Sequence, residues 1–239
     1  MILRITLLAA LIFRGHEARA QEPAKKSWKD TAELNLTNTT GNTKVMTLGI
    51  NDLYGYDRAR WGLELKAGLL TSRSQGAATA EQYNAGEKAI DKVTGSFYGY
   101  EKVGWDKNRF AGILSRYDAS LGVGDVLLEK GSDKVSAEAG AGFIAERRPD
   151  KQNNFASGRL YGKYLRTLSK TANLSQDAEY LNDFKDAKDY RFNAETALIA
   201  AVSTRFSLKA SYKWKRVGKP APGFGKDDTI LGAALILNY

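Results

Sequence analysis

The sequence has no cysteine, and its single histidine, His16, stands close to the N-terminus. Without thiols the chain can form neither disulfide bonds nor thiolate metal sites. We expect His16 to be removed with an export signal, so the mature chain would also lack an imidazole. These absences exclude a Ser-His triad, a cysteine nucleophile and most zinc sites, and they count against a phospholipase-type barrel. We therefore expect a protein that is not an enzyme and that carries no metal and no cofactor.

Long apolar runs are also missing. The run from Ile5 to Phe13 is nine residues long, whereas a membrane-spanning helix needs about 20. Arg4 precedes this run and the A-x-A pattern Ala18-Arg19-Ala20 follows it, so residues 1–20 are predicted to be a cleaved signal peptide. The other interpretation is a buried helix, for which no helical partner follows. Residues 21–239 are expected to form a single domain.

Positive charge exceeds negative charge along the chain. There are 36 Lys and Arg residues against 27 Asp and Glu residues, which gives a net charge of +9. A basic exported chain meets acidic lipid head groups and anionic solutes rather than nucleic acid. We therefore expect outer-membrane lipid and lipopolysaccharide as partners, contacted by Arg147-Arg148 and by Lys215 to Lys219, and no nucleic acid. The other interpretation is that these cations occupy solvated loops.

What the sequence does contain is alternation with a period of two. In the segment from Thr229 to Tyr239, the large apolar residues Leu231, Leu235 and Leu237 share one face with the terminal tyrosine. A terminal aromatic residue after alternating apolar residues is typical of the closing strand of an outer-membrane barrel. Leu235, Leu237 and Tyr239 are therefore predicted to be a signal for the barrel-assembly machinery. The last strand of a soluble barrel or sandwich would show a similar pattern.

Comparable segments of about 10–14 residues recur from Trp28 onward, with turn residues between them. An even number of strands places both chain termini at one end of a barrel, the periplasmic one. We expect longer connections at the external end, including a Ser/Gly/Ala-rich loop from Thr71 to Thr79. The twelve predicted strands cover 28–38, 43–56, 60–71, 80–91, 95–106, 110–123, 134–146, 155–168, 172–182, 189–202, 206–217 and 229–239.

Turn lengths predict the register of neighbouring strands, because their apolar faces must match. The turns used are Arg58-Ala59, Ser169-Lys170-Thr171 and Ser203-Thr204-Arg205. The expected opposite pairs are Tyr56 with Trp61, Leu48 with Leu69, Leu160 with Tyr180, Lys163 with Asp177, Ala194 with Trp214, and Glu195 with Lys213.

Charged residues occupy the strand face opposite the apolar one. In a soluble barrel the inner face would be apolar, so the pattern indicates a barrel with its apolar face in lipid and its charges in the lumen. Lipid requires every backbone polar group to be paired, which favours closure into a transmembrane antiparallel up-and-down β-barrel. Twelve strands enclose more space than the eight whose side chains just fill the interior. The predicted lumen charge network is Arg116, Glu138, Arg159, Lys163, Asp177, Glu195, Lys209 and Lys213.

Several short motifs carry a family resemblance. They are Gly41-Asn42-Thr43, Arg116-Tyr117, Gly122-Val123-Gly124 and the strand Gly140-Ala141-Gly142-Phe143. In this order they resemble domain of unknown function family 481, labelled salt-induced outer-membrane proteins (YdiY-like), over about Trp28 to Tyr239. The resemblance implies location in the bacterial outer membrane and a link to salt or osmotic stress. It implies no activity and no binding residues.

Three functions remain open at this point. The first is a structural, salt-stress-related protein of the cell envelope with a lumen filled largely by side chains. The second is a small pore or solute-binding channel whose charged lumen, with a wall rich in basic residues, selects ions or solutes by sign. The third is a soluble periplasmic β-protein. An enzyme would need a carboxylate pair or a Ser-Lys dyad, and no spacing singles one out.

Overall fold

The computed structural model describes residues 27–39 and 45–239. The predicted signal peptide and the Gly41-Asn42-Thr43 turn lie outside these ranges. Within them the chain forms twelve antiparallel strands and one short 3-10 helix, η1 (Arg109–Ala111). No helix in the described ranges is long and apolar enough to cross a membrane. The strands are β1 (Trp28–Thr39), β2 (Val45–Asp57), β3 (Trp61–Ser74), β4 (Ala77–Lys92), β5 (Phe97–Asn108), β6 (Ile113–Lys130), β7 (Asp133–Arg147), β8 (Gln152–Thr167), β9 (Ala172–Asp183), β10 (Tyr190–Ala201), β11 (Phe206–Val217) and β12 (Asp227–Asn238).

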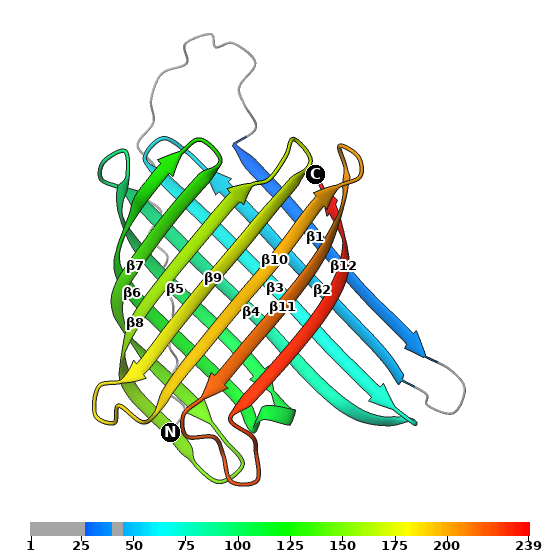
Figure 1. Ribbon diagram of the computed structural model, residues 1–239. Helices are drawn as coiled ribbons and strands as arrows, with labels where there is room; N and C mark the ends of the chain where they lie inside the picture. The colour runs from blue at the N-terminus through cyan, green and yellow to red at the C-terminus, as the bar shows by residue number, and fades with distance from the viewer. Residues whose placement is uncertain (1–26, 40–44) are drawn as a thin grey trace, which may run out of the picture.

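Each strand pairs with the next one in sequence, and β1 pairs with β12, so the sheet closes into a barrel (Figure 1). The beginning of β1 and the end of β12 lie at the same end of the barrel, where Thr31 lies opposite Asn238. We call this the terminal end and the opposite one the far end. The prediction of a twelve-stranded barrel is therefore confirmed, and its first strand begins at the same end of the barrel where its last strand finishes.

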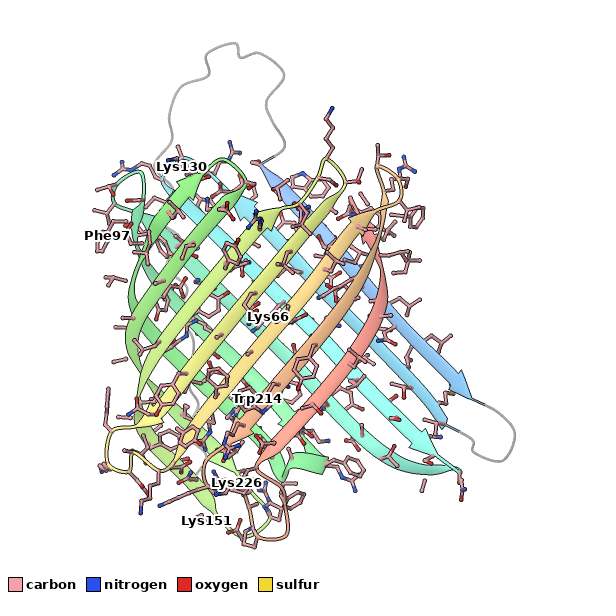
Figure 2. All side chains as sticks on the ribbon, in the orientation of Figure 1. Lys66, Phe97, Lys130, Lys151, Trp214 and Lys226 are labelled. Carbon is pink, nitrogen blue, oxygen red and sulfur yellow. The ribbon has the colours of Figure 1, made fainter. Side chains whose placement is uncertain are left out.

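Apolar side chains cover the outside of this barrel. Leu208 on β11 is 54% exposed, whereas the neighbouring Lys209 forms ion pairs inside the lumen. In the part of the chain that the structure describes, the buried apolar cluster consists of only Ile144, Phe155 and Leu181. Figure 2 shows side chains on both surfaces of the wall, with Phe97 at the outer surface near the terminal end. The alternation predicted from the sequence therefore has its apolar face outward.

Strand register agrees with the prediction in the C-terminal half. Leu160 faces Tyr180 and Lys163 faces Asp177, as expected for a three-residue turn. The pairs Ala194 with Trp214 and Glu195 with Lys213 are also confirmed.

The predicted register between β2 and β3 is wrong by two residues. Tyr56 faces Leu63 instead of Trp61, and Leu48 faces Thr71 instead of Leu69. The two-residue turn lies one residue later than expected, at Ala59-Arg60, and the Arg58 N–H donates to the Trp61 carbonyl oxygen. An even shift keeps every side chain on its own face, so the apolar and charged faces stay as predicted.

The predicted loop from Thr71 to Thr79 is also wrong, because β3 and β4 join in a two-residue turn. Gln75 and Gly76 form it with φ values of 50° and 85°. Two central residues with positive φ are typical of the type I′ hairpin turn, whose twist matches that of the strands. The small polar residues on either side fit a strand as well as a loop, and composition alone did not distinguish the two.

Candidate functional site

The interior of the barrel is the candidate site, because the charged side chains gather there. Six residues of the predicted lumen charge network join three groups of ion pairs. The remaining two, Lys163 and Asp177, lie opposite each other on β8 and β9, and Asp177 lines the interior cavity.

The first group, the central network, crosses the lumen. Arg159 Nη1 lies 2.8 Å from Glu138 Oε2, and Arg159 Nε lies 2.7 Å from Glu179 Oε1. Lys88 on β4 pairs with Glu138 on β7, and Lys102 on β5 lies 3.0 Å from Glu179 on β9. Two or three strands separate these partners along the wall, so their side chains meet through the interior. The network consists of Lys88, Lys102, Asp118, Glu138, Arg159 and Glu179.

Tyrosines surround the cations of the central network. The Arg159 guanidinium lies 5.0 Å from the ring centre of Tyr100 and 5.1 Å from that of Tyr161. Lys88 Nζ lies within cation–π distance of the same two rings, at 5.3 and 5.6 Å. The Tyr98 hydroxyl donates to Glu138 over 2.9 Å. These contacts replace part of the water that the buried charges have lost.

The second group, the closure network, lies where β1 meets β12. Lys209 Nζ lies 2.9 Å from Glu33 Oε1 on β1 and 2.9 Å from Glu195 Oε1 on β10. Lys213 adds a contact of 3.3 Å to Glu195. Since Lys209 belongs to β11, its ion pair with Glu33 spans the inner face of β12. The closure network therefore ties β1 to the strand beyond its neighbour.

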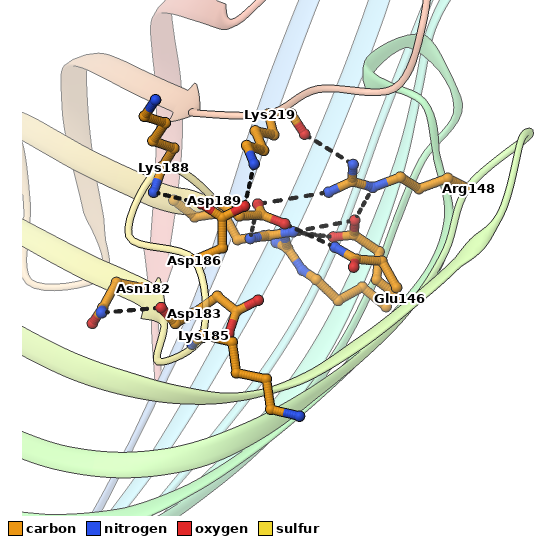
Figure 3. A network of polar contacts seen from close by, with 12 residues as sticks. Glu146, Arg148, Asn182, Asp183, Lys185, Asp186, Lys188, Asp189 and Lys219 are labelled. Atoms are coloured by element: carbon orange, nitrogen blue, oxygen red, sulfur yellow. Dashed lines mark hydrogen bonds and ion pairs between the residues drawn. The ribbon is translucent and has the colours of Figure 1, made fainter.

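The third group, the far-end network, is the most deeply buried (Figure 3). Glu146 and Arg191 are 2% and 1% exposed, and Arg191 Nη2 lies 3.2 Å from Glu146 Oε1. Arg191 Nη1 also lies 2.8 Å from Asp189 Oδ1, and Arg148 pairs with Glu146. Arg116 on β6 also pairs with Glu146, with Arg116 Nη1 3.6 Å from Glu146 Oε2. Two arginines and two carboxylates at the centre neutralise one another, as buried charges require.

The loop 218–226 between β11 and β12 is held against this network. Arg148 Nη1 donates to the Lys219 carbonyl oxygen over 2.9 Å, and the Lys219 side chain pairs with Asp186 of the β9–β10 loop. Ala221 is buried beside Gly112, the left-handed residue that ends η1. The hydrogen bond from Lys219 holds the pKa of the Asp186 carboxyl below its ordinary value, and the same bond raises the pKa of Lys219.

A cavity of about 430 Å³ lies inside the barrel. Its lining is nearly balanced in charge, so the wall rich in basic residues that was expected for a channel is not what the structure shows. The acidic lining residues are Glu33, Glu64, Glu87, Asp106, Asp118, Asp177, Glu179 and Glu195, and the basic ones are Lys66, Lys88, Lys102, Arg116, Arg159, Lys213 and Lys215. Among the described residues, no group of three or more His, Cys, Asp or Glu side chains is placed to hold a metal ion.

Sequence reasoning missed the partners that cross the lumen. Lys88 and Lys102 lie on β4 and β5, which contributed no residue to the predicted lumen charge network. Glu179 follows the predicted Asp177 by two positions on β9 and therefore lies on the same inward face. Strand alternation could have predicted that Glu179 belongs to the network. Glu146 and Arg191 lie at strand ends, where the pattern gave no reason to expect burial.

The predicted assembly signal lies at the joint between β12 and its neighbours. Leu235 and Tyr239 are exposed, and Leu237 lies opposite Ala32 of β1 and Phe206 of β11. Its recognition by assembly machinery stays a prediction.

Comparison with known proteins agrees with this architecture. The family model described as "Protein of unknown function, DUF481" matches residues 32–239. The chain is 27% identical over 220 residues to the uncharacterized protein YdiY of Escherichia coli (strain K12), which covers 90% of this chain and 84% of that protein.

Two solved structures share the fold. The translocator domain of the autotransporter NalP from Neisseria meningitidis is 13% identical, with a TM-score of 0.50, and the match covers 91% of this chain and 90% of that one. The COG4313 outer membrane channel from Pseudomonas putida F1 is 11% identical, with a TM-score of 0.51 and coverage of 89% and 94%. At these identities the two structures show the fold alone, that of an outer-membrane barrel.

Proposed function

Because the chain belongs to the DUF481 family and folds as a closed barrel of the outer-membrane type, we propose that it is a structural protein of the bacterial outer membrane whose lumen is filled by its own side chains. The observation that carries the proposal is the central network. Its ion pairs join β4 to β7 and β5 to β9 through the interior. Paired charges that cross the lumen leave few free charges to select and pass ions.

Recording from planar bilayers tests the filled lumen. The refolded wild type is expected to give no stable channel openings. A triple variant, Glu138→Gln, Arg159→Met and Glu179→Gln, removes the pairs that cross the lumen and is expected to give openings. Glu129→Gln serves as control, because it removes an exposed pair with Lys134 at a turn of the terminal end. Stable openings of the wild type would refute the proposal.

Fractionation of cells tests the location. The apolar outer surface supports insertion in a bilayer, and the protein is expected to sediment with the outer membrane and to migrate differently on gels before and after heating. Recovery in the soluble periplasmic fraction would favour the soluble β-protein instead.

Lipopolysaccharide phosphates are the partners proposed for the far end, which faces the cell exterior if both chain ends are periplasmic. The contacts expected from the sequence need correction, because Arg148 is buried in the far-end network and Lys215 lines the cavity. Exposed cations remain at this end, among them Arg147, Lys151, Lys185, Lys188, Lys219 and Lys226. Replacing Lys151, Lys185 and Lys188 with glutamine is expected to weaken lipopolysaccharide binding, measured by sedimentation with it at low salt.

The proposed stress role predicts a phenotype. Cells that lack the protein are expected to survive less well in high salt or detergent, and the wild-type gene is expected to restore survival. Unchanged survival would count against an envelope role under salt stress.

A small solute channel is the second candidate, and the cavity of about 430 Å³ favours it. Its balanced lining suits a neutral or zwitterionic solute better than a single ion of either sign. The bilayer recordings separate the two candidates, because only a channel opens in the wild type.

A further inference from the structure

The joint between β1 and β12 is much shorter than the other strand pairings. Its register covers only Thr31 to Leu34 against Leu235 to Asn238, whereas β10 and β11 pair over eleven positions. Within the described ranges, β1 from Asn35 onward is paired only with β2, and β12 from Asp227 to Ala234 only with β11. In Figure 1 the two strands run apart toward the far end. We call these two facing edges the seam.

A seam of this kind is costly in a bilayer. Lipid offers no hydrogen bonds, so each unpaired backbone group in contact with it costs several kcal/mol. The interior cavity reaches the seam, because Asn35 of β1 and Gly232 and Ala234 of β12 line it. Water or a polar group in the cavity can therefore satisfy the open strand edges from the lumen side.

The inner face of β12 is unlike that of the other strands. Between Asp228 and Asn238 its inward residues are Ile230, Gly232, Ala234 and Ile236, whereas β11 next to it presents Lys209 and Lys213. A strand that is apolar on both faces is typical of burial on both sides. On the outer face, Leu231 is 85% exposed, more than any other large apolar residue in the described ranges. Apolar surface is thus continuous from outside to inside along β12, at the position where no strand covers its edge.

From these observations we infer that the seam is a lateral opening for a single-chain amphiphile of the bilayer, such as a lysophospholipid. The acyl chain lies along the inner face of β12, and the polar head lies in the charged cavity. The apolar inner face supplies the contact that an acyl chain needs, and the cavity supplies hydrogen bonds and charge. This inference goes beyond the proposed function, since a lumen closed to axial ion flow can still receive a molecule from the side.

Two contacts define the limit of the opening on the side of the terminal end. The Lys209–Glu33 ion pair holds β1 to β11 at the level of the four registered pairs. On the far-end side of this ion pair, a Cβ atom on Gly232 would lie 3.3 Å from Asn35 Nδ2, so the Asn35 side chain reaches the edge of β12 inside the lumen. Cysteines at these two positions, bridged by a short bifunctional thiol reagent, would therefore close the seam from within, and the absence of native cysteine makes this the single thiol cross-link in the protein.

Photolabelling tests the inference with the full-length mature protein in lipid vesicles. The reagent is lysophosphatidylcholine with a diazirine in its acyl chain, and mass spectrometry identifies the labelled residues. On the wild type, label is expected at the inner positions Ile230 and Ala234 as well as at the outer Leu231. Label confined to outer positions would overturn the inference. A strand of another polypeptide that fills the seam would give this same result.

A locked variant provides the second arm. Asn35→Cys with Gly232→Cys, once bridged by a short bis-methanethiosulfonate reagent, is expected to lose the label at Ile230 and Ala234 while Leu231 is still labelled, and reduction of the bridge is expected to restore the inner label. The matched control is Ala200→Cys with Leu208→Cys, which links positions already paired on β10 and β11 and should leave all labels unchanged. Equal inner labelling of the locked and unlocked proteins would show entry through a barrel mouth and would overturn the lateral route. Folding of each variant is checked by its heat-dependent gel mobility.

Discussion

At the scale of single residues, burial decides what a charge contributes. Arg159 is 4% exposed and serves two carboxylates, Glu138 and Glu179, from one guanidinium. The planar guanidinium offers several donors in fixed directions, which a lysine ammonium does not. By contrast, the Lys134–Glu129 pair at the terminal end is largely exposed, and pairs of that kind contribute little. The two types of pair are therefore expected to respond very differently to substitution.

The variant Arg159→Met tests this difference. It leaves Glu138 and Glu179 without their shared partner inside the barrel, and breaking a buried pair in this way costs about 3–5 kcal/mol. The free energy of unfolding in urea, measured in lipid vesicles, should fall by that amount. Glu129→Gln should change it by less than about 0.5 kcal/mol. Equal effects of the two substitutions would contradict the importance of the central network.

At the scale of strands and turns, the sequence predicted some features well and others poorly. Alternation identifies the face of each strand, and the three-residue turns predicted correctly the register of β8 with β9 and that of β10 with β11. Small polar residues around Gln75 and Gly76 suit both strand and loop, so the β3–β4 hairpin was missed. Contacts across the lumen, such as Lys102 with Glu179, depend on the curvature of the closed sheet. Alternation shows that both residues point inward, but not that they meet.

The β3–β4 turn leads to a prediction about Gly76. Its φ of 85° lies in the left-handed region, where a Cβ atom costs roughly 1–2 kcal/mol. Gly76→Ala should lower the free energy of unfolding by about that much. Gly162→Ala is the matched control, because a Cβ there meets nothing within 4 Å and its φ is not positive. Similar losses for both variants would contradict the turn geometry.

The loop 218–226 is expected to respond to acid. Because the pKa of Asp186 is lowered in the folded protein, its pair with Lys219 stabilises the loop fully above the ordinary value of 3.8. This stabilisation is lost as pH falls below 3.8 through the lower folded value. Limited digestion with pepsin should therefore cut the wild-type loop faster at the acid end of that window. In Asp186→Asn the rate of cleavage should lack this pH-dependent step.

At the scale of the whole molecule, the barrel reverses the usual arrangement of a soluble protein. Its large apolar residues, including Leu121, Leu160 and Leu198, are exposed, whereas Arg148, Arg159 and Arg191 are buried. In water this surface would be a large apolar patch, whereas in a bilayer it is the solvated surface. The sequence predicted this reversal because the prediction needs only one observation, namely which alternate residues of each strand are apolar and which are charged.

The reversal predicts the effect of Leu198→Arg in the middle of β10. Lipid-facing arginine costs about 2–4 kcal/mol near the bilayer midplane, whereas the same change on a protein surface in water costs less than about 0.5 kcal/mol. Unfolding in urea from vesicles should therefore show the larger loss. The conservative change Leu198→Ile should show almost none. A small effect of Leu198→Arg would mean that this face does not contact lipid.

The short joint between β1 and β12 has a consequence for the order of assembly. The other eleven pairings join strands that follow each other along the chain, but this one brings together residues from its two ends; Glu33 and Lys209 are 176 positions apart. Contacts between such distant residues are the slowest to form. The ring can therefore close only after the last strand has been synthesised. Its final joint has the fewest paired positions, and we expect it to break first under mechanical load.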